Sequence, residues 1–147
     1  MHGVWLHDDT LHGDRRVTKP GPEGAGALAL VIDDEPLVRE QIAALLEQFN
    51  YQVVLACDGL DALTKVAIYG QRLRLVTSDF RMPGTDGIDL VRTLRRLLAR
   101  DVTIVVISGL IDDEEIQALL EIGVDHVLRK PFDRSALARA ITPKPRA

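Results

Sequence analysis

Five short apolar runs alternate with five segments of helical periodicity along this chain. The segments between the runs repeat their apolar residues at intervals of three and four, which is the pattern of amphipathic helices. Strands separated by helices pair in parallel through right-handed crossovers, and strands covered on both faces have continuous apolar sequences. We therefore predict an α/β fold, a doubly wound five-stranded parallel sheet with strand order 2-1-3-4-5. The expected strands are 27–32, 52–56, 73–78, 103–107 and 124–128.

The helical segments begin and end at residues that favour helix termini. Pro36 suits a first turn, Asn50 can close that helix, and Asp58 can cap the next one, which stops at Gly70. The acidic run 112–115 lies at the start of the fourth helix, where the helix dipole favours negative charge. The last helix is expected at about 133–141.

The folded domain is expected over residues 27–141. Residues 1–26 are polar and turn-rich and end in a proline- and glycine-rich stretch, so we expect a disordered N-terminal extension and linker there. Residues 142–147 are expected to form a C-terminal tail. The total of 147 residues suits one domain with a substantial core.

Composition excludes several classes of function. The formal net charge of −4 argues against a direct nucleic-acid-binding domain, which needs an excess of Lys and Arg to neutralise phosphates. No apolar run approaches the roughly 20 residues of a membrane span, and the N-terminus lacks the apolar core of a signal peptide. A cytoplasmic location is the default expectation.

Reactive side chains follow four of the five expected strands. Asp33 and Asp34 come after the first strand, Asp79 after the third, Ser108 after the fourth and Lys130 near the end of the fifth. In doubly wound sheets, ligands bind outside the carboxyl ends of the strands, at the point where the strand order reverses. The sequence therefore predicts that these five side chains converge at one edge of the sheet.

Three grouped carboxylates repel one another and offer the hard oxygen ligands that Mg²⁺ prefers. We expect Asp34 and Asp79 to bind Mg²⁺ directly or nearly so, with Asp33 close by and the backbone carbonyl of Arg81 as a further ligand. Magnesium sites commonly include phosphate oxygens, so the awaited group is a phosphoryl. Asp79, at the centre, is the candidate nucleophile that forms an acyl phosphate.

Two further side chains fit the same chemistry. Lys130 would neutralise charge on the phosphoryl oxygens, together with the metal. The Ser108 hydroxyl would donate a hydrogen bond to one of those oxygens. As an alternative, Ser108 is a strand-end turn residue and Lys130 a solvated surface lysine.

These motifs together resemble the receiver domain of two-component response regulators, which has the flavodoxin-like, CheY-like fold. The resemblance covers roughly 27–141 and depends on four stretches of the sequence. They are Val31-Ile32-Asp33-Asp34-Glu35-Pro36, Asp79-Phe80-Arg81-Met82-Pro83 with Asp86-Gly87, Ile107-Ser108-Gly109, and Lys130-Pro131-Phe132.

The resemblance implies a phosphoaspartate switch that requires Mg²⁺. Asp79 would take a phosphoryl group from a phosphohistidine on a sensor histidine kinase or a histidine phosphotransfer protein, and the chain would catalyse only its own phosphorylation and dephosphorylation. Ser108 and the loop after it would move toward the phosphoryl group. The face made by the fourth helix, fifth strand and fifth helix would then change and bind a downstream protein. Family members sometimes form homodimers through this face, and the peptide bond between Lys130 and Pro131 is typically cis.

The sequence departs from the family pattern in three places. Val127 stands where the family usually has an aromatic switch residue, so the coupling through a ring is in doubt. Arg81, two residues past Asp79, could shield the phosphoryl group, pair with site carboxylates or face solvent. The chain stops after the fifth helix, so no output domain is expected on it.

Three other functions stay open. An aspartate-nucleophile phosphatase using Mg²⁺ would need a second acid two residues after the nucleophile, where Arg81 stands. A flavin- or nucleotide-binding domain would need a Gly/Ser-rich phosphate loop after the first strand, where the sequence has Asp-Asp-Glu. An interaction module that binds partners regardless of phosphorylation is compatible with Val127 but leaves the acidic residues unexplained.

Overall fold

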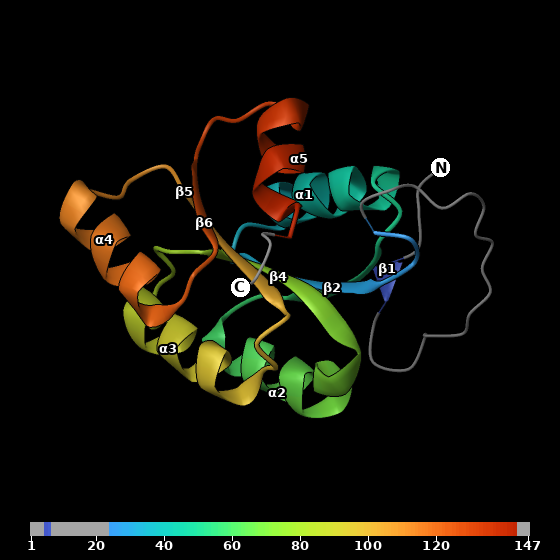
Figure 1. Cartoon of the computed structure of the whole chain (residues 1–147), viewed down its shortest axis with the longest axis horizontal. Coiled ribbons are helices and arrows are strands. Elements are labelled where there is room, and N and C mark those ends of the chain that lie inside the picture. The colour runs from blue at the N-terminus through green and yellow to red at the C-terminus, as the bar shows by residue number, and fades with distance from the viewer. Residues whose placement is uncertain (1–4, 7–23, 144–147) are drawn as a thin grey trace.

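The computed structural model describes residues 5–6 and 24–143. A six-stranded parallel sheet of order β1-β3-β2-β4-β5-β6 has helices α1 and α5 on one face and α2, α3 and α4 on the other (Figure 1). The elements are β1 Trp5–Leu6, β2 Leu28–Ile32, α1 Pro36–Gln48, β3 Gln52–Ala56, α2 Gly59–Tyr69, the 3-10 turn η1 Gly70–Arg72, β4 Leu73–Asp79, α3 Gly87–Leu97, β5 Thr103–Ser108, α4 Asp113–Ile122, β6 His126–Arg129 and α5 Arg134–Ile141.

The five predicted strands and their order are confirmed. Strands β3, β2, β4, β5 and β6 correspond to the predicted order 2-1-3-4-5, and every pair is parallel. The fifth predicted strand begins later than expected, at His126. The residues before it close α4, because Gly123 adopts a φ of 115° and the N–H of Val124 donates to the carbonyl of Leu119.

The structure differs from the expected N-terminal extension at two places within residues 1–26. Trp5 and Leu6 form β1, which pairs with Val53 and Val54 at the edge of the sheet. The N–H of Gly24 donates to the carbonyl of Phe49 at 2.9 Å, so the folded domain begins before residue 27. Without β1, β3 would be the edge strand, and β1 pairs with part of its otherwise unpaired backbone. The rest of the expected extension, and residues 144–147 of the expected tail, lie outside the described residues.

Each strand supplies both faces of the sheet, because successive side chains point to opposite sides. Leu30, Ile32 and Val76 pack under α2, α3 and α4, whereas Val31 and Leu75 pack under α1 and α5. All five are almost completely buried. This two-sided burial explains the continuous apolar runs, and it fixes the strand ends that carry the polar residues. Within the described residues, no helix combines the length and apolar character needed to cross a bilayer.

Aspartates cap four of the five described helices that follow loops at the carboxyl edge of the sheet, namely α2, α3, α4 and α5. Asp58 accepts a hydrogen bond from the N–H of Asp61 at 2.8 Å, and Asp86 accepts from the N–H of Ile88 at 3.0 Å. The caps of α4 and α5 are Asp112 and Asp133. A cap satisfies backbone donors that the first turn leaves unpaired, so each loop ends at a fixed point.

Gly87 sets the position of the loop that follows Asp79. A Cβ atom at residue 87 would lie 2.5 Å from the carbonyl oxygen of Phe80 and 2.6 Å from its ring. The first residue of α3 therefore contacts the backbone next to Asp79, and a side chain at that position would displace it. This contact explains why glycine follows the Asp86 cap.

Candidate functional site

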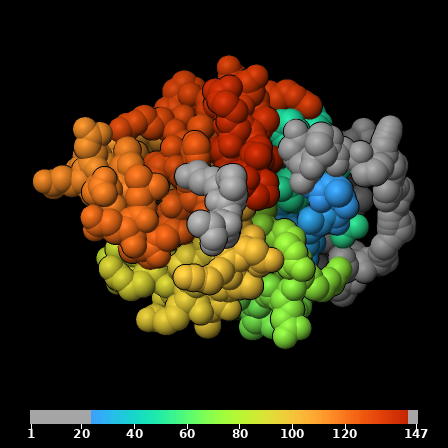
Figure 2. Space-filling view, viewed as in Figure 1, coloured from blue at the N-terminus to red at the C-terminus, as the bar shows by residue number. Residues whose placement is uncertain are grey.

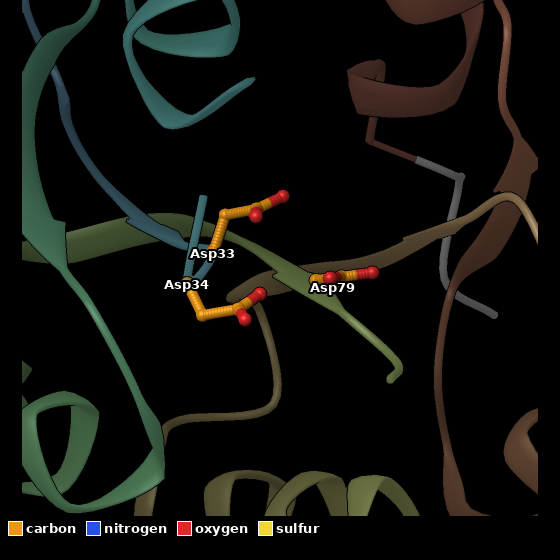
Figure 3. Close-up of side chains that lie close together, drawn as sticks. All are labelled: Asp33, Asp34 and Asp79. Carbon is orange, nitrogen blue, oxygen red and sulfur yellow. The ribbon is translucent and has the colours of Figure 1, made fainter. Parts of the chain in front are cut away.

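Three aspartates meet beyond the carboxyl ends of β2 and β4. Asp33 and Asp34 follow β2, and Asp79 is the last residue of β4; one carboxylate oxygen from each lies within 4.8 Å of the others (Figure 3). Ile32 is paired with Ser78, so the two strands bring the next residues side by side. The predicted convergence of these three acids is therefore observed.

Asp33 is fully buried and held on several sides. Its N–H donates to the carbonyl of Ala56 at 3.1 Å, and its Oδ1 accepts from the N–H of Glu35 at 3.0 Å. Its own carbonyl accepts from Nη1 of Arg39 at 2.7 Å. Sequence reasoning missed Arg39, because nothing in its helical spacing distinguishes it from a solvated residue. These contacts fix the direction in which the carboxylate points.

Asp79 is 9% exposed. Its Oδ1 accepts from the N–H of Phe80 at 2.9 Å and lies 3.6 Å from Nζ of Lys130. Burial, followed by the negative charge of Asp33, raises the pKa of the Asp79 carboxyl above its usual range, with Asp34 adding to the effect. Lys130 and the Phe80 N–H act in the opposite direction but do not cancel the increase. The surroundings of Asp79 therefore disfavour its charged, carboxylate form.

Lys130 joins the acidic cluster from the end of β6. Its Nζ lies 3.5 Å from Oδ2 of Asp33 and 3.6 Å from Oδ1 of Asp79. Its backbone N–H donates to the carbonyl of Ser108 at 2.9 Å, and the Lys130–Pro131 peptide bond is cis, as the resemblance implies. The predicted place of Lys130 beside the acids is confirmed by this geometry.

The donor set suits Mg²⁺. Three carboxylates gather at one point, where burial and the charges of Asp33 and Asp34 raise the pKa of Asp79, and a divalent cation would offset their mutual repulsion. Carboxylate oxygens are the ligands that Mg²⁺ prefers, and it commonly uses one or two of them with water. Asp33, Asp34 and Asp79 are the residues that would hold the ion. The role of the Arg81 carbonyl as a further ligand stays a prediction.

Ser108 lies at the end of β5, but its hydroxyl is engaged with its own loop. It donates to the carbonyl of Leu110 and accepts from the N–H of Leu110, both at 3.2 Å. The predicted contact of Ser108 with a phosphoryl group therefore requires these bonds to change. Val127 is half-buried and packs against the core under α2, α3 and α4.

The Arg81 guanidinium points toward α4. Nη2 lies 2.8 Å from both carboxylate oxygens of Glu115, and Nε donates to the carbonyl of Leu110 at 3.1 Å. The guanidinium also lies over the ring of Phe80, 4.8 Å from its centroid. Sequence reasoning considered Arg81 beside the site carboxylates or facing solvent, and it missed Glu115. The sequence predicts Glu115 at the start of the fourth helix and shows no signal for a contact across 34 residues.

Comparisons with known proteins agree with this geometry. A family model for the response regulator receiver domain matches residues 29–142. The transcriptional regulatory protein AruR of Pseudomonas aeruginosa is 37% identical over 115 residues, and the match covers 76% of this chain and 46% of AruR. Chemotaxis protein CheY of Treponema pallidum is 32% identical over 129 residues, covering 87% of this chain and 89% of CheY. The chain thus spans less than half the length of AruR and most of CheY.

A solved structure gives the same result for the fold. The response regulator receiver protein from Pseudomonas putida aligns with a TM-score of 0.69 at 32% identity, over 80% of this chain and 97% of that one. The similarity therefore covers most of this chain and nearly all of the solved receiver protein.

Proposed function

The chain belongs to the response regulator receiver family, and we propose on this premise that it is a phosphoacceptor module with Asp79 as the acceptor. The donor is a phosphohistidine on a sensor histidine kinase or a histidine phosphotransfer protein. The observation that carries the proposal is the meeting of Asp33, Asp34 and Asp79 within 4.8 Å, with Lys130 contacting two of them. Such a cluster suits in-line attack on a charged phosphoryl group.

The reaction follows from the placement of these groups. An Asp79 carboxylate oxygen attacks phosphorus, and its new O–P bond forms as the N–P bond of the phosphohistidine breaks. The bonding electrons stay on the imidazole nitrogen, which takes up a proton. The Phe80 N–H and Lys130 orient the Asp79 carboxylate, and Lys130 then pairs with a phosphoryl oxygen. Mg²⁺, when bound, supplies further neutralisation of the phosphoryl charge.

The module changes partner binding and turns over no other substrate in this proposal. Its output face is α4, β6 and α5; Figure 2 shows α4 in orange and α5 in red on one side of the molecule. Val127 packs against the core from β6, and because valine has no ring, the proposed signal does not use an aromatic switch residue at that position. In this proposal a downstream protein binds this face, and the module acts within a phosphorelay. Its location is the cytoplasm.

Acetyl phosphate with Mg²⁺ tests the acceptor directly. The wild-type chain should gain a phosphoryl adduct that is stable in acid and labile in base, detected by intact-protein mass. Asp79→Asn should remove the adduct entirely, because an amide is not a nucleophile for phosphorus. Asp89→Asn is the matched control, since Asp89 is an exposed aspartate on α3 that pairs with Arg92 outside the acidic cluster.

Two outcomes would contradict the proposal. Equal labelling of the wild type and Asp79→Asn would place the acceptor elsewhere. Steady hydrolysis of many phosphomonoesters by the wild type would indicate the aspartate-nucleophile phosphatase instead. Beryllofluoride, a phosphoryl mimic, separates the remaining case: a partner bound equally well with and without it is bound regardless of phosphorylation.

A further inference from the structure

Arg81 connects the loop after Asp79 to the loop after Ser108. Its guanidinium forms a two-oxygen ion pair with Glu115, at the start of α4, and donates to the carbonyl of Leu110. The planar guanidinium offers several donors in a fixed fork, so one side chain can hold a carboxylate and a carbonyl at once. The loop between β5 and α4 is therefore tied to the residue that lies two positions past the phosphoacceptor.

The same Leu110 carbonyl also accepts the Ser108 hydroxyl proton. A hydroxyl carries a single proton, so Ser108 cannot donate to Leu110 and to a phosphoryl oxygen together. Arg81 holds this carbonyl with a 3.1 Å hydrogen bond. The side chain of Arg81 thus stabilises the acceptor that competes with a phosphoryl group for the Ser108 proton.

Apolar contacts at the start of α4 come from Ile111, which is buried just before the Asp112 cap, and from the partly buried Ile116. Leu119 is the one residue of α4 that is buried, and it lies in the second half of the helix. Figure 1 shows α4 at the outer edge of the molecule. On the other side of the loop, Nη1 of Arg129 donates to the carbonyl of Ile111 at 2.9 Å. Polar contacts from Arg81 and Arg129 therefore hold two neighbouring carbonyls of this loop.

We propose that Arg81 and Glu115 are positioning residues that hold the β5–α4 loop in its resting conformation and so weaken phosphoryl binding at Asp79. They act through Leu110 on Ser108 and do not touch the phosphoryl group themselves. This inference rests on the proposed phosphoacceptor function and assigns a regulator to the same site. The Arg81 and Glu115 side chains are 50% and 26% exposed, so their ion pair biases the loop and does not lock it.

Glu115→Gln gives the sharpest test. Glu115 also accepts from the N–H of Asp112 at 3.1 Å as part of a capping box, and glutamine preserves that role while it removes the charge. Arg81→Gln removes the other partner. In each variant, isothermal calorimetry should show beryllofluoride binding, with Mg²⁺ in excess, that is about two- to fivefold tighter than in the wild type. The double variant should match Arg81→Gln, because without the guanidinium the Glu115 charge has no ion pair left to lose.

Two controls separate a positioning role from general damage. Arg92→Gln breaks the exposed Arg92–Asp89 ion pair of 3.0 Å on α3 and should leave beryllofluoride affinity unchanged. Affinity for Mg²⁺ alone should be the same in the wild type, Arg81→Gln and Glu115→Gln, because their carboxylate cluster is intact. High salt should reduce the difference between the wild type and Glu115→Gln, since an exposed ion pair is screened.

The outcomes that overturn the inference differ from those that overturn the proposed function. If the wild type binds beryllofluoride and Glu115→Gln binds it equally well or more weakly, the positioning role is wrong. Opposite effects of Arg81→Gln and Glu115→Gln would mean that the guanidinium meets the phosphoryl group directly, which also overturns it. If the wild type binds no beryllofluoride with Mg²⁺ present, the phosphoacceptor function fails, and this inference fails with it.

Discussion

Two ion-pair systems lie on either side of the end of β4, and they differ in burial. Lys130 contacts Asp33 and Asp79 at 3.5 and 3.6 Å in a mostly buried setting, whereas Arg81 contacts Glu115 at 2.8 Å near the surface. The Arg81–Glu115 contact is the shorter one, but it influences the chemistry of the site less. Water screens the exposed pair, but the buried contacts act in a medium of low dielectric constant, where each charge is felt strongly.

The two systems also differ in charge balance. Arg81 and Glu115 neutralise each other, so opening this pair costs little and exposes two well-solvated groups. Among the described residues, three carboxylates lie together and Lys130 contacts two of them, while burial and the charge of Asp33 raise the pKa of Asp79. The buried system is therefore arranged to gain from a cation and a phosphoryl group, and the exposed system is arranged to open. The buried contacts of Lys130 therefore serve the chemistry, and the exposed Arg81–Glu115 pair serves the switching.

Replacement of Lys130 should have the largest effect of the changes considered, on the rate of phosphorylation by acetyl phosphate. In Lys130→Ala, the rate of phosphorylation by acetyl phosphate should fall about 100- to 1000-fold, because a preorganised cation at the developing charge is lost. Arg81→Gln should change that rate only a few-fold, since its ion pair is exposed. The rates are measured from the accumulation of the adduct by intact-protein mass. A loss below tenfold in Lys130→Ala, or equal losses in the two variants, would remove the distinction between the two systems.

The acids and Lys130 could be predicted from the sequence because backbone topology places them. Parallel strands end at a common edge, so residues that follow strand ends are brought together whatever their separation along the chain. Asp33, Asp79 and Lys130 needed no knowledge of side-chain direction to be grouped. The aspartate caps at Asp58 and Asp86 were predictable for a similar reason, because a cap is a local hydrogen bond.

The contacts of Arg81 could not be predicted, because a side-chain contact across 34 residues depends on how the β5–α4 loop folds over the sheet. The Ser108 hydroxyl shows the same limit: its position at the strand end was predictable, but its bond to Leu110 depends on the path of the loop. Strand β1 was missed because two residues, Trp5 and Leu6, carry no measurable periodicity. Contacts that follow from strand order can be predicted from the sequence, whereas contacts that depend on the path of a loop cannot.

Magnesium should stabilise the protein through the buried system alone. At a Mg²⁺ concentration 100 times the dissociation constant, the free energy of unfolding should rise by about 2.7 kcal/mol, because the ion binds the folded state. Asp79→Asn without Mg²⁺ should be more stable than the wild type, since burial and Asp33 disfavour the Asp79 charge. It should also lose most of the Mg²⁺ response. Urea unfolding with and without Mg²⁺ measures both. Glu115→Gln should keep the full increase in stability with Mg²⁺. If that increase were lost in Glu115→Gln, the exposed and buried ion pairs would not act separately.

Replacement of Glu47 should have the smallest effect on stability. Glu47 has a raised pKa but lies away from the acidic cluster, so it tests whether the Mg²⁺ response is specific to that cluster. It lies near the far end of α1, about 16 Å along the helix from the turn that follows the acidic cluster. Burial raises the pKa of the Glu47 carboxyl to about 7. Between pH 4.5 and about 7 the folded protein therefore binds more protons at Glu47 than the unfolded protein, so this contribution is complete below pH 4.5 and is lost as pH rises through 7.

Glu47→Gln removes that titration, so its stability relative to the wild type should increase as pH rises from 5 to 8. The gain should be about 1 kcal/mol or less, because the side chain is only half-buried and solvent screens part of the effect. Urea unfolding at the two pH values measures it. The response to Mg²⁺ should stay that of the wild type, since Glu47 lies outside the acidic cluster. A Mg²⁺ response that changed in Glu47→Gln would mean that a raised carboxyl pKa anywhere in this fold couples to the metal. In that case the burial of the Asp33, Asp79 and Lys130 contacts would no longer explain what distinguishes the site.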